Sequence, residues 1–318
     1  MKYQLIISEN SNATAENLFN FKRYFFNEIA HLQHQGGEES YTFYWQNIVT
    51  RTIDARFSVL IKNNIAYSPL KATFGGIEFS ESLSENVLSS FLVASISHLK
   101  DKIPNLKQLV MNAYPAGYFS VKQQEIQDNC LLKLGFYIKF TEQNFEIKIS
   151  QKSFYNTVIS LRAKQLLRKA DKNKFIFKQE LNPDLLNFHA FIERSRIRKN
   201  RPMTMDLVQL TEHFQKFPEN FYFFSVYQNE QTIAVAVTIK INEEILYTFY
   251  LADHEDFLKD SPTTFLLSGI YEYTQQQNFK ILDLGIATDK GILNEGLSHF
   301  KRSLGAELSD KKTYFILF

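Results

Sequence analysis

Apolar and polar positions follow two different periods in the first half of the chain. Residues 55–68 (ARFSVLIKNNIAYS) alternate on either side of Asn63-Asn64, which predicts a β-hairpin because Asn tolerates the backbone of a tight turn. Residues 85–100 place apolar side chains every three or four positions, which predicts a helix. A short apolar run at 106–112 predicts the next strand. The order is therefore hairpin, helix, strand.

The second half shows a similar order, with a strand added between the hairpin and the helix. The expected elements are a hairpin of residues 221–226 and 233–241 turning at Asn229-Glu230, a strand at 244–252, a helix at 263–277 and a strand at 281–286. Ser261 and Pro262 suit the cap and the first turn of that helix. The repeat is one of pattern only, without evident identity. It predicts an α+β fold of two tandem domains, residues 1–150 and 151–318, each with a mixed, twisted sheet flanked by helices. The pattern leaves open which of the two domains the last strand, 313–318, completes.

Basic residues concentrate where the second predicted domain begins. Residues 151–178 hold eight Lys and Arg side chains and one Asp, in a chain whose net charge is only +2. Such a segment is typical of a solvated helix face, and equally of a site for phosphate or another polyanion, with Arg162 and Arg168 as candidate ligands. Nucleic acid, tRNA included, is the less favoured anion because no aromatic residues interleave with the basic ones at 162–174.

Composition excludes several classes of protein. The single Cys130 rules out an intramolecular disulfide and a cysteine-based zinc site. His31 and His34 lie three apart without a third ligand nearby, so we expect surface histidines and no metal. Phosphate loops and the G-x-S-x-G elbow are absent. No apolar run approaches the ~18 residues of a membrane span, and the chain begins without a signal peptide, so we expect a cytoplasmic protein.

Two loops are candidates for chemistry. The strand ending at Asp283 runs into DLGIATDKGILNEGLSHFK, where Asp283, Glu295 and Lys301 are the candidate catalytic residues. Asp283 has an equally good interpretation as a carboxylate that holds the next turn, and Glu295 as a helix cap. Elsewhere, SPLKATFGGIEF carries a cation and a Gly-Gly pair, which also fits an ordinary turn. The candidate substrate-binding residues outside the basic segment are Lys71, Phe74, Gly75, Gly76, Tyr250 and Thr288.

Taken together, DLGIATDKG and the following NEGLSHFKRSLGAE resemble the C-terminal motif of the FemABX-like proteins, in the GNAT acyltransferase superfamily. Phe300, Lys301, Leu304 and Gly305 match its second segment. LRAKQLLRKADKNKF and ERSRIRKNRP resemble the family's basic helix and its arginine-bearing helix and loop. The resemblance implies tandem GNAT-like domains, Lys301 in the transfer step and Arg198 on the phosphates of a precursor. It implies no tightly bound cofactor, with acyl-CoA or aminoacyl-tRNA as the donor co-substrate.

Two features depart from the family pattern. A coiled-coil arm does not follow the basic helix, and DFLKDSPTT stands where GNAT proteins carry a glycine-rich pyrophosphate loop. The leading hypothesis is an N-acyltransferase that moves an acyl or aminoacyl group to an amine of a cell-envelope precursor or nucleotide-linked sugar, a phosphate-bearing small molecule. The alternative is a non-catalytic GNAT-like protein that binds a phosphorylated or nucleotide-sugar ligand. An RNA-binding module based on the basic helix is the third.

Overall fold

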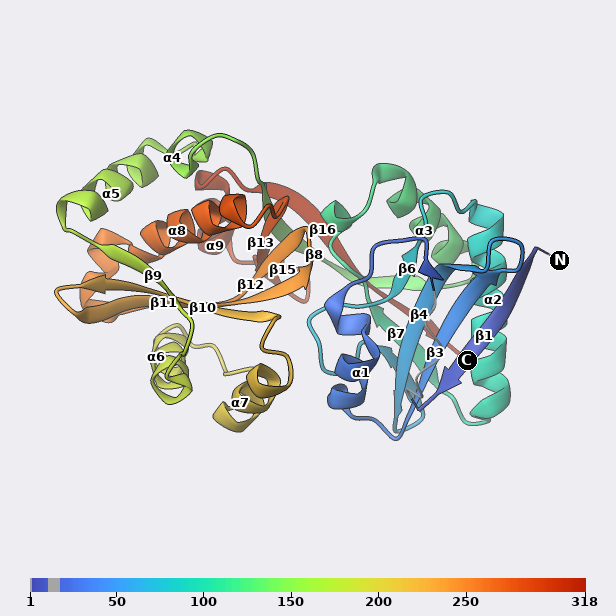
Figure 1. Ribbon diagram of the computed structural model, residues 1–318. Helices are drawn as coiled ribbons and strands as arrows, with labels where there is room; N and C mark the ends of the chain where they lie inside the picture. The colour runs from blue at the N-terminus through green and yellow to red at the C-terminus, as the bar shows by residue number, and fades with distance from the viewer. Residues whose placement is uncertain (1, 11–17) are drawn as a thin grey trace. The chain divides into compact units, whose positions relative to one another are not determined.

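The computed structural model describes residues 2–10 and 18–318, which form two compact units (Figure 1). Unit 1 runs to Gln143 and includes Thr288–Ile292 and Ser309–Phe318, and unit 2 comprises Asn144–Ala287 and Leu293–Leu308. The boundaries therefore fall inside the strands β8 (Tyr137–Lys148) and β16 (Glu307–Leu317). The division of the chain into domains of residues 1–150 and 151–318 stays a prediction.

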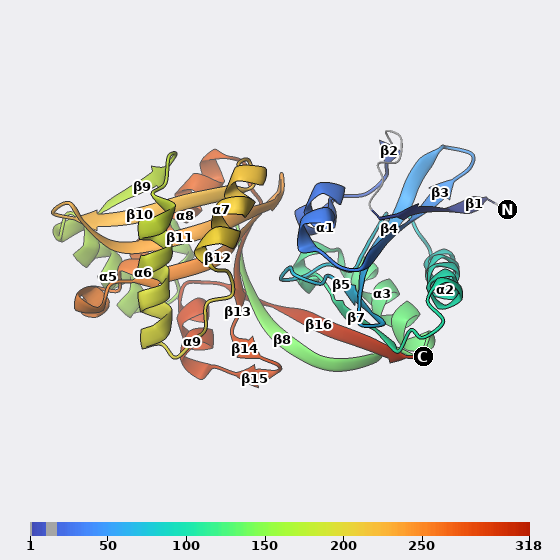
Figure 2. The same ribbon diagram turned by 90° about the horizontal axis from the view of Figure 1, so that it is seen from below.

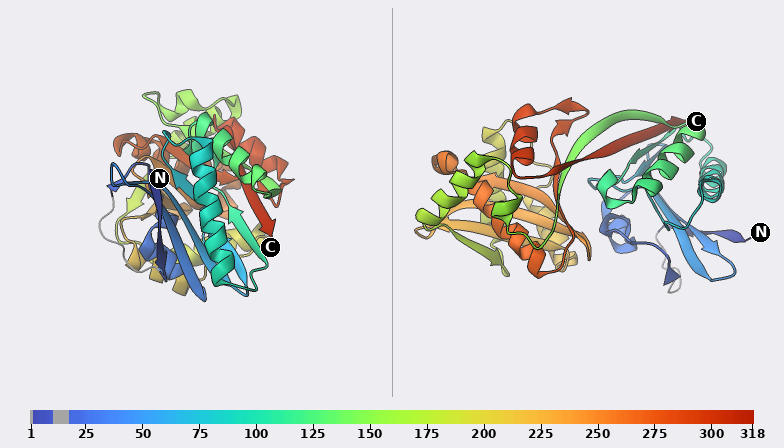
Figure 3. Two further views of the ribbon diagram at one scale, coloured as in Figure 1. Left: turned by 90° about the vertical axis from the view of Figure 1, so that its right-hand side faces the viewer. Right: turned by 90° about the horizontal axis from the view of Figure 1, so that it is seen from above.

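Unit 1 is a sheet with helices packed against it. Its strand order is β1 (Tyr3–Glu9), β3 (Glu39–Asn47), β4 (Thr52–Lys62), β5 (Ile65–Ser68), β7 (Gln108–Asn112) and β16, while β2 (Leu18–Phe19) and β6 (Ile77–Phe79) pair with β4. The helices are α1 (Ile29–Gln35), α2 (Glu85–Lys102) and α3 (Val121–Lys133), with single turns at η1 (Phe25–Asn27) and η2 (Ala116–Tyr118). Leu88, Phe91 and Leu92 of α2 pack into a core with residues of β3 and β4, and Figure 3 shows α2 lying along these strands.

Unit 2 repeats the arrangement. Its strand order is β8, β13 (Ile281–Ile286), β12 (Ile245–Asp253), β11 (Gln231–Asn242), β10 (Phe221–Gln228) and β9 (Ile176–Glu180). The helices are α4 (Phe154–Thr157), α5 (Leu161–Lys172), α6 (Leu185–Arg198), α7 (Leu207–Lys216), α8 (Pro262–Gln276) and α9 (Glu295–Ser303), with the turn η3 (Glu255–Asp260). The ribbon of β14 (Thr288–Asp289) and β15 (Ile292–Leu293) belongs to unit 1 except for its last residue, Leu293. Figure 1 shows α5 and α8 over one face of the sheet and α6 and α7 over the other.

Each unit completes its sheet with a strand from the other half of the sequence. β8 follows α3, a helix of unit 1, yet its residues Asn144–Lys148 pair with β13 of unit 2. β16 follows α9, a helix of unit 2, yet its residues Thr313–Leu317 pair with β7 of unit 1. Figure 2 shows β8 and β16 as long, curved strands. The last strand therefore returns to the first half of the chain, which answers the question that the sequence left open.

Local sequence explains most of the elements. Asn63 and Asn64, at φ +53° and +58°, form the predicted turn between β4 and β5, and Asn229 and Glu230 form the second. The expected α+β class is confirmed. Two smaller expectations are wrong. Ser261 has φ +46° and its hydroxyl bonds the Thr264 hydroxyl at 2.9 Å, so it does not cap a backbone N–H.

The second wrong expectation concerns the histidines, because His31 is buried against the rings of Phe25 and Phe26. Within residues 2–10 and 18–318, no three His, Cys, Asp or Glu side chains lie as a metal site would need. Across the same residues, no helix has both the length and the apolar character to span a membrane.

Candidate active site

A cavity of about 670 Å³ opens in unit 2 where two parallel strands diverge. β12 and β13 pair only from Ile245 to Tyr247 and from Ile281 to Asp283. Beyond these residues the strands separate, and the cavity lies between them. Its walls come from the end of α6, from β12, from the starts of α8 and α9, and from the end of β13. The lining residues that carry the chemistry are Arg196, Arg201, Phe249, Gly285, Phe300 and Lys301.

Bulges in both strands accompany this divergence. On β12, Tyr250 lies opposite Val237 and Thr248 opposite Thr238, so Phe249 has no residue opposite it among the described pairings. A bulged residue of this kind leaves a backbone group outside the ladder, here at the cavity wall. On β13 the register shifts at Gly285, whose φ of +74° favours glycine. A Cβ at Gly285 would also lie 3.4 Å from the Tyr247 ring.

Lys301 projects from α9 into this region and is only 4% exposed. Its Nζ donates to the carbonyl oxygens of Gly285 and Ile286, each at 2.8 Å. The Phe145 ring lies beneath it, 5.9 Å from Nζ to the ring centroid. No carboxylate of the described residues forms an ion pair with Lys301. The bulge at Gly285 thus supplies one of the two carbonyls that fix the amine.

Burial lowers the pKa of Lys301 to about 7, because the ammonium loses its water without gaining a paired carboxylate. The Asp283 charge acts in the opposite direction, and the Arg201 charge lowers the pKa further. A neutral amine has two N–H donors and one lone pair. Because the two carbonyls accept the two donors, the lone pair of the neutral form stays available to a group in the cavity.

Cations and one carboxylate form another side of the cavity, at the end of α6. Asp253 Oδ1 accepts hydrogen bonds from Arg198, from Lys199 at 2.8 Å and from Ser195 at 3.2 Å. Burial raises the pKa of Asp253, but Lys199 and Arg198 lower it by more. Arg196 donates to the Pro202 carbonyl at 2.8 and 2.6 Å. Arg201 is exposed and has no ion pair among the described residues. This side of the cavity therefore favours an anion.

The other candidate catalytic residues occupy structural positions. Asp283 is buried, and its Oδ1 accepts from the Gly285 N–H at 2.6 Å and from Asn144 at 2.9 Å, so it holds the bulge beneath Lys301. Glu295 is the exposed first residue of α9. The capping side chain is Asn294, which accepts from the Leu297 N–H at 2.9 Å. Catalytic roles for Asp283 and Glu295 stay predictions.

The predicted binding residues are dispersed. Tyr250 is buried, bonds Thr204 at 2.5 Å and lies under the Arg196 guanidinium, while Arg198 is the partner of Asp253. Thr288, in unit 1, accepts from the Gln143 N–H at 2.9 Å. Arg162 and Arg168 are exposed on α5 and do not line the cavity.

The Gly-Gly loop also belongs to unit 1. Lys71 is exposed and Phe74 is buried. Gly75 lies against Pro69, where a Cβ would be 3.0 Å from the proline Cδ, and Gly76 has φ +100° and donates to Ser68 at 3.1 Å. These contacts fit a packed turn, so a role in substrate binding stays a prediction.

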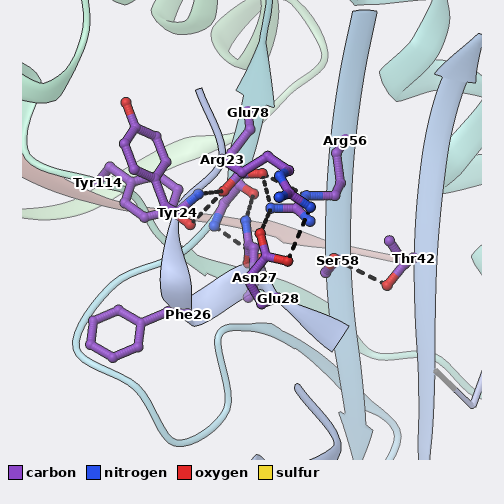
Figure 4. A network of polar contacts seen from close by, with 12 residues as sticks. Arg23, Tyr24, Phe26, Asn27, Glu28, Thr42, Arg56, Ser58, Glu78 and Tyr114 are labelled. Carbon is purple, nitrogen blue, oxygen red and sulfur yellow. Dashed lines mark hydrogen bonds and ion pairs between the residues drawn. The ribbon is translucent and has the colours of Figure 1, made fainter. Parts of the chain in front are cut away.

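Unit 1 holds a separate group of buried charges around Arg56 (Figure 4). The Arg56 guanidinium is 1% exposed and donates to Glu78 through Nε at 2.6 Å, with Glu28 at 3.3 Å. Glu78 also accepts from the Tyr24 N–H at 3.0 Å and the Tyr114 hydroxyl at 3.1 Å. Burial lowers the pKa of Arg56, but the Glu78 and Glu28 carboxylates raise it by more. Arg56 and the two carboxylates are thus paired with each other inside this cluster.

No protein-family model and no curated protein sequence matches the chain, but solved structures do. FemX superposes with a TM-score of 0.69 at 14% identity, over 87% of each chain. A tandem GNAT protein from the clavulanic acid biosynthesis pathway gives a TM-score of 0.55 at 8% identity, over 87% of this chain and 82% of its own. L-PGS from Bacillus licheniformis gives 0.54 at 10% identity, over 82% and 80%.

The chain has the FemABX-like, tandem GNAT fold. This confirms the expected resemblance and fold class, and identities this low carry the fold alone. Phe249 was missed, because a single bulged residue leaves no periodic signal in the sequence. Asp253 was also missed, although its position at the end of an apolar strand, just before the loop DHEDFLKDSP, is a signal that could have suggested it.

Proposed function

We propose that the protein is an acyl- or aminoacyltransferase that moves an acyl group onto an amine. The observation that carries this proposal is the Lys301 amine: it is buried, lies in a large cavity and has a pKa lowered to about 7. A group with such a pKa is matched to proton transfer near neutral pH. The FemABX-like fold supports the same reaction class.

In the proposed reaction, the acceptor amine attacks the carbonyl carbon of the donor. A C–N bond forms, the C–O or C–S bond of an ester or thioester breaks, and the leaving group departs as alcohol or thiol. Neutral Lys301 accepts the proton that the attacking nitrogen loses, and passes it to the leaving oxygen or sulfur. The backbone at the Phe249 bulge is the candidate donor to the oxyanion that develops on the carbonyl oxygen.

The acceptor in this proposal carries an anionic group. Arg201 and Arg196 line the cavity, and the net charge of the α6 end remains positive after Asp253 is counted. A phosphate beside these guanidinium groups would place the acceptor amine toward Lys301. This supports a cell-envelope precursor or a nucleotide-linked amino sugar in the role of acceptor, as the sequence predicts.

A second candidate, a non-catalytic binding protein, is favoured by the start of α8. Pro262 has no N–H to offer there, Ser261 takes a left-handed conformation, and Asp256 and Asp260 precede it. This is a poor cradle for the pyrophosphate of CoA. The same feature disfavours acyl-CoA as the donor if the protein is an enzyme, so acyl-CoA and aminoacyl-tRNA are tested side by side.

The test is a transfer assay that follows the acyl-acceptor product by mass spectrometry, with each donor and with nucleotide-linked amino sugars or peptides as acceptors. Lys301→Met should reduce kcat/KM by about 100-fold or more, because the base is lost. The matched control is Arg302→Met, which removes the neighbouring cation above the same Phe145 ring but on the exposed side. Equal turnover of Lys301→Met and wild type would refute the proposal, and acceptor binding without turnover by any donor would favour the binding protein.

A further inference from the structure

Helix α5 presents a row of cations that the cavity does not use. Ala163, Leu167 and Ala170 are buried and face the rest of unit 2. The basic face comprises the cationic side chains of the opposite side of α5 and of its flanks: Lys152, Arg162, Lys164, Arg168, Lys172 and Lys174. A helix with one buried apolar stripe and one basic stripe is fixed to the protein and offers its charge to a partner.

The charge of the basic face is mostly uncompensated. Lys169 is neutralised by Asp260 at 2.5 Å, and Asp171 is the one acid within α5. Within the described part of the chain, the six cations of the basic face form no ion pair. Tyr155 holds two of them in place, because Lys164 and Arg168 lie 5.4 and 5.3 Å from its ring centroid. The cations are therefore presented by a supported surface.

Two aliphatic side chains lie beside these cations. Ile159 is 73% exposed and Leu161 is 78% exposed, at the start of α5. The backbone that carries them is fixed, since the N–H groups of Ile159 and Ser160 donate to the Ser303 carbonyl at 3.2 and 3.1 Å. Ser160 also caps α5 through the Ala163 N–H. The apolar pair is thus held exposed at the end of α5 where the basic face begins.

We propose that the basic face, with Ile159 and Leu161, docks on an anionic lipid bilayer. Cations attract the acidic headgroups, while two aliphatic side chains beside them can enter the interface. An RNA would be held by the same cations, but Ile159 and Leu161 give bases no ring on which to stack, and the Tyr155 ring is already in contact with Lys164 and Arg168. Since residues 151–178 carry more positive charge than the whole chain, the remainder is net negative and an anionic membrane repels it. Docking therefore has one preferred orientation, and it does not depend on the proposed function.

The test is cosedimentation of the full chain with large vesicles of phosphatidylcholine alone and of phosphatidylcholine mixed with phosphatidylglycerol. We expect binding to the mixed vesicles only, weakening as salt is raised. Arg162→Glu/Lys172→Glu should reduce the affinity by about tenfold or more, because each basic residue near an anionic surface contributes on the order of 1 kcal/mol. The two changes have opposite effects on the α5 dipole, so the helix should remain folded, which thermal unfolding checks.

Matched controls come from unit 1. Lys62→Glu/Lys107→Glu reverses two exposed lysines there and should leave binding within about twofold, because both lie outside the basic face. Leu161→Asn should weaken the binding that persists at high salt, whereas Val121→Asn should not. Val121 is also the first residue of a Ser-capped helix and is 70% exposed, so the pair is matched in helix position and closely in exposure.

Three results would overturn the proposal. One is failure of the wild type to sediment with the mixed vesicles. Another is an equal loss in the variants of unit 1, which would indicate attraction by overall charge alone. The last is tight, salt-dependent binding of tRNA together with vesicle binding that Leu161→Asn leaves unchanged, which would assign the basic face to nucleic acid.

Discussion

Arg56 in unit 1 and Lys301 in unit 2 are both buried cations, but their surroundings differ. Arg56 has two carboxylate partners, Glu78 and Glu28, and Glu78 is itself held by Tyr24 and Tyr114. Lys301 has two carbonyl oxygens and a cavity. The pKa shifts follow, because the carboxylates raise the pKa of Arg56 while burial lowers that of Lys301. The Arg56 charge is therefore compensated by carboxylates within unit 1, whereas the Lys301 amine in unit 2 donates to carbonyl oxygens.

The two units also differ in how far their parallel strands pair, which explains why the cavity lies in unit 2. In unit 1 the pairing of β5 with β7 extends over the whole of β5, from Ile65 to Ser68, and Gly75 continues it by bridging to Ala113. In unit 2 the corresponding parallel pair, β12 with β13, stops at Tyr247 while β12 continues to Asp253. The cavity therefore opens in the unit whose parallel strands separate early.

The largest expected effect comes from Arg56, the buried cation that is paired with carboxylates. Arg56→Met leaves the Glu78 carboxylate buried without a cation, so unfolding by urea should show a loss of about 3–5 kcal/mol. Arg56→Met/Glu78→Gln should recover much of this, because the amide oxygen still accepts from Tyr24 and Tyr114. Arg23→Met is the control: its ion pair with Glu28 is exposed, at 3.5 Å, and its loss should be below about 1 kcal/mol. If Arg56→Met lost no more stability than Arg23→Met, the buried Glu78 carboxylate would not depend on the Arg56 cation, and the contrast with Lys301 would fail.

The next largest effect comes from Lys301, the buried cation without a carboxylate partner among the described residues, and appears in how stability depends on pH. The folded-state pKa of Lys301 is about 7 and its unfolded value is that of an ordinary lysine, so the unfolded chain binds more protons between them. Wild-type stability should therefore rise with pH through that window. Lys301→Met has no such group, and its stability relative to wild type should fall by about 3 kcal/mol from pH 6 to pH 9. A parallel pH dependence of the two proteins would show that Lys301 is charged in the folded state throughout.

Much of this fold could be predicted from local sequence. Residues close together in the chain determine the turns at Asn63-Asn64 and Asn229-Glu230 and the helix α2. Turn-forming residues indicate the turns, and the spacing of apolar residues indicates the helix. The exchange of β8 and β16 could not be predicted, because a strand's period is the same whichever sheet it joins.

The site was only partly predictable for the same physical reason. Lys301 follows from the resemblance of its motif, but its carbonyl partners depend on a bulge that one residue makes. Arg56 lies in a strand whose alternation indicates one solvent face, whereas β4 is buried on both faces except at its ends. The neighbours of Arg56 are Glu78 of β6 and the residues flanking η1, and the alternation within β4 gives no information on them.

A smaller effect separates the two charges that act on Lys301. Asp283 raises the pKa of Lys301 and Arg201 lowers it. Asp283→Asn should therefore move the acid limb of kcat/KM to lower pH, and Arg201→Gln should move it to higher pH, each by about one unit or less. The amide introduced by Asp283→Asn keeps an oxygen that can accept from the Gly285 N–H, so the bulge should survive. Glu295→Gln should leave the limb in place, and shifts of the same sign in both variants would contradict the assignment of that limb to Lys301.

The smallest effect concerns how each cation is positioned. Arg56 projects from a strand with neighbours on both sides, whereas Lys301 depends on α9, which has nine residues and one capping side chain. Asn294→Ala removes the acceptor of the Leu297 N–H and should cost about 1 kcal/mol of stability. Glu295→Ala, one residue further on, should change stability by less than about 0.5 kcal/mol, because the side chain is exposed. Thermal unfolding of the two variants decides between the two caps: a larger loss in Glu295→Ala would return the capping role to the carboxylate.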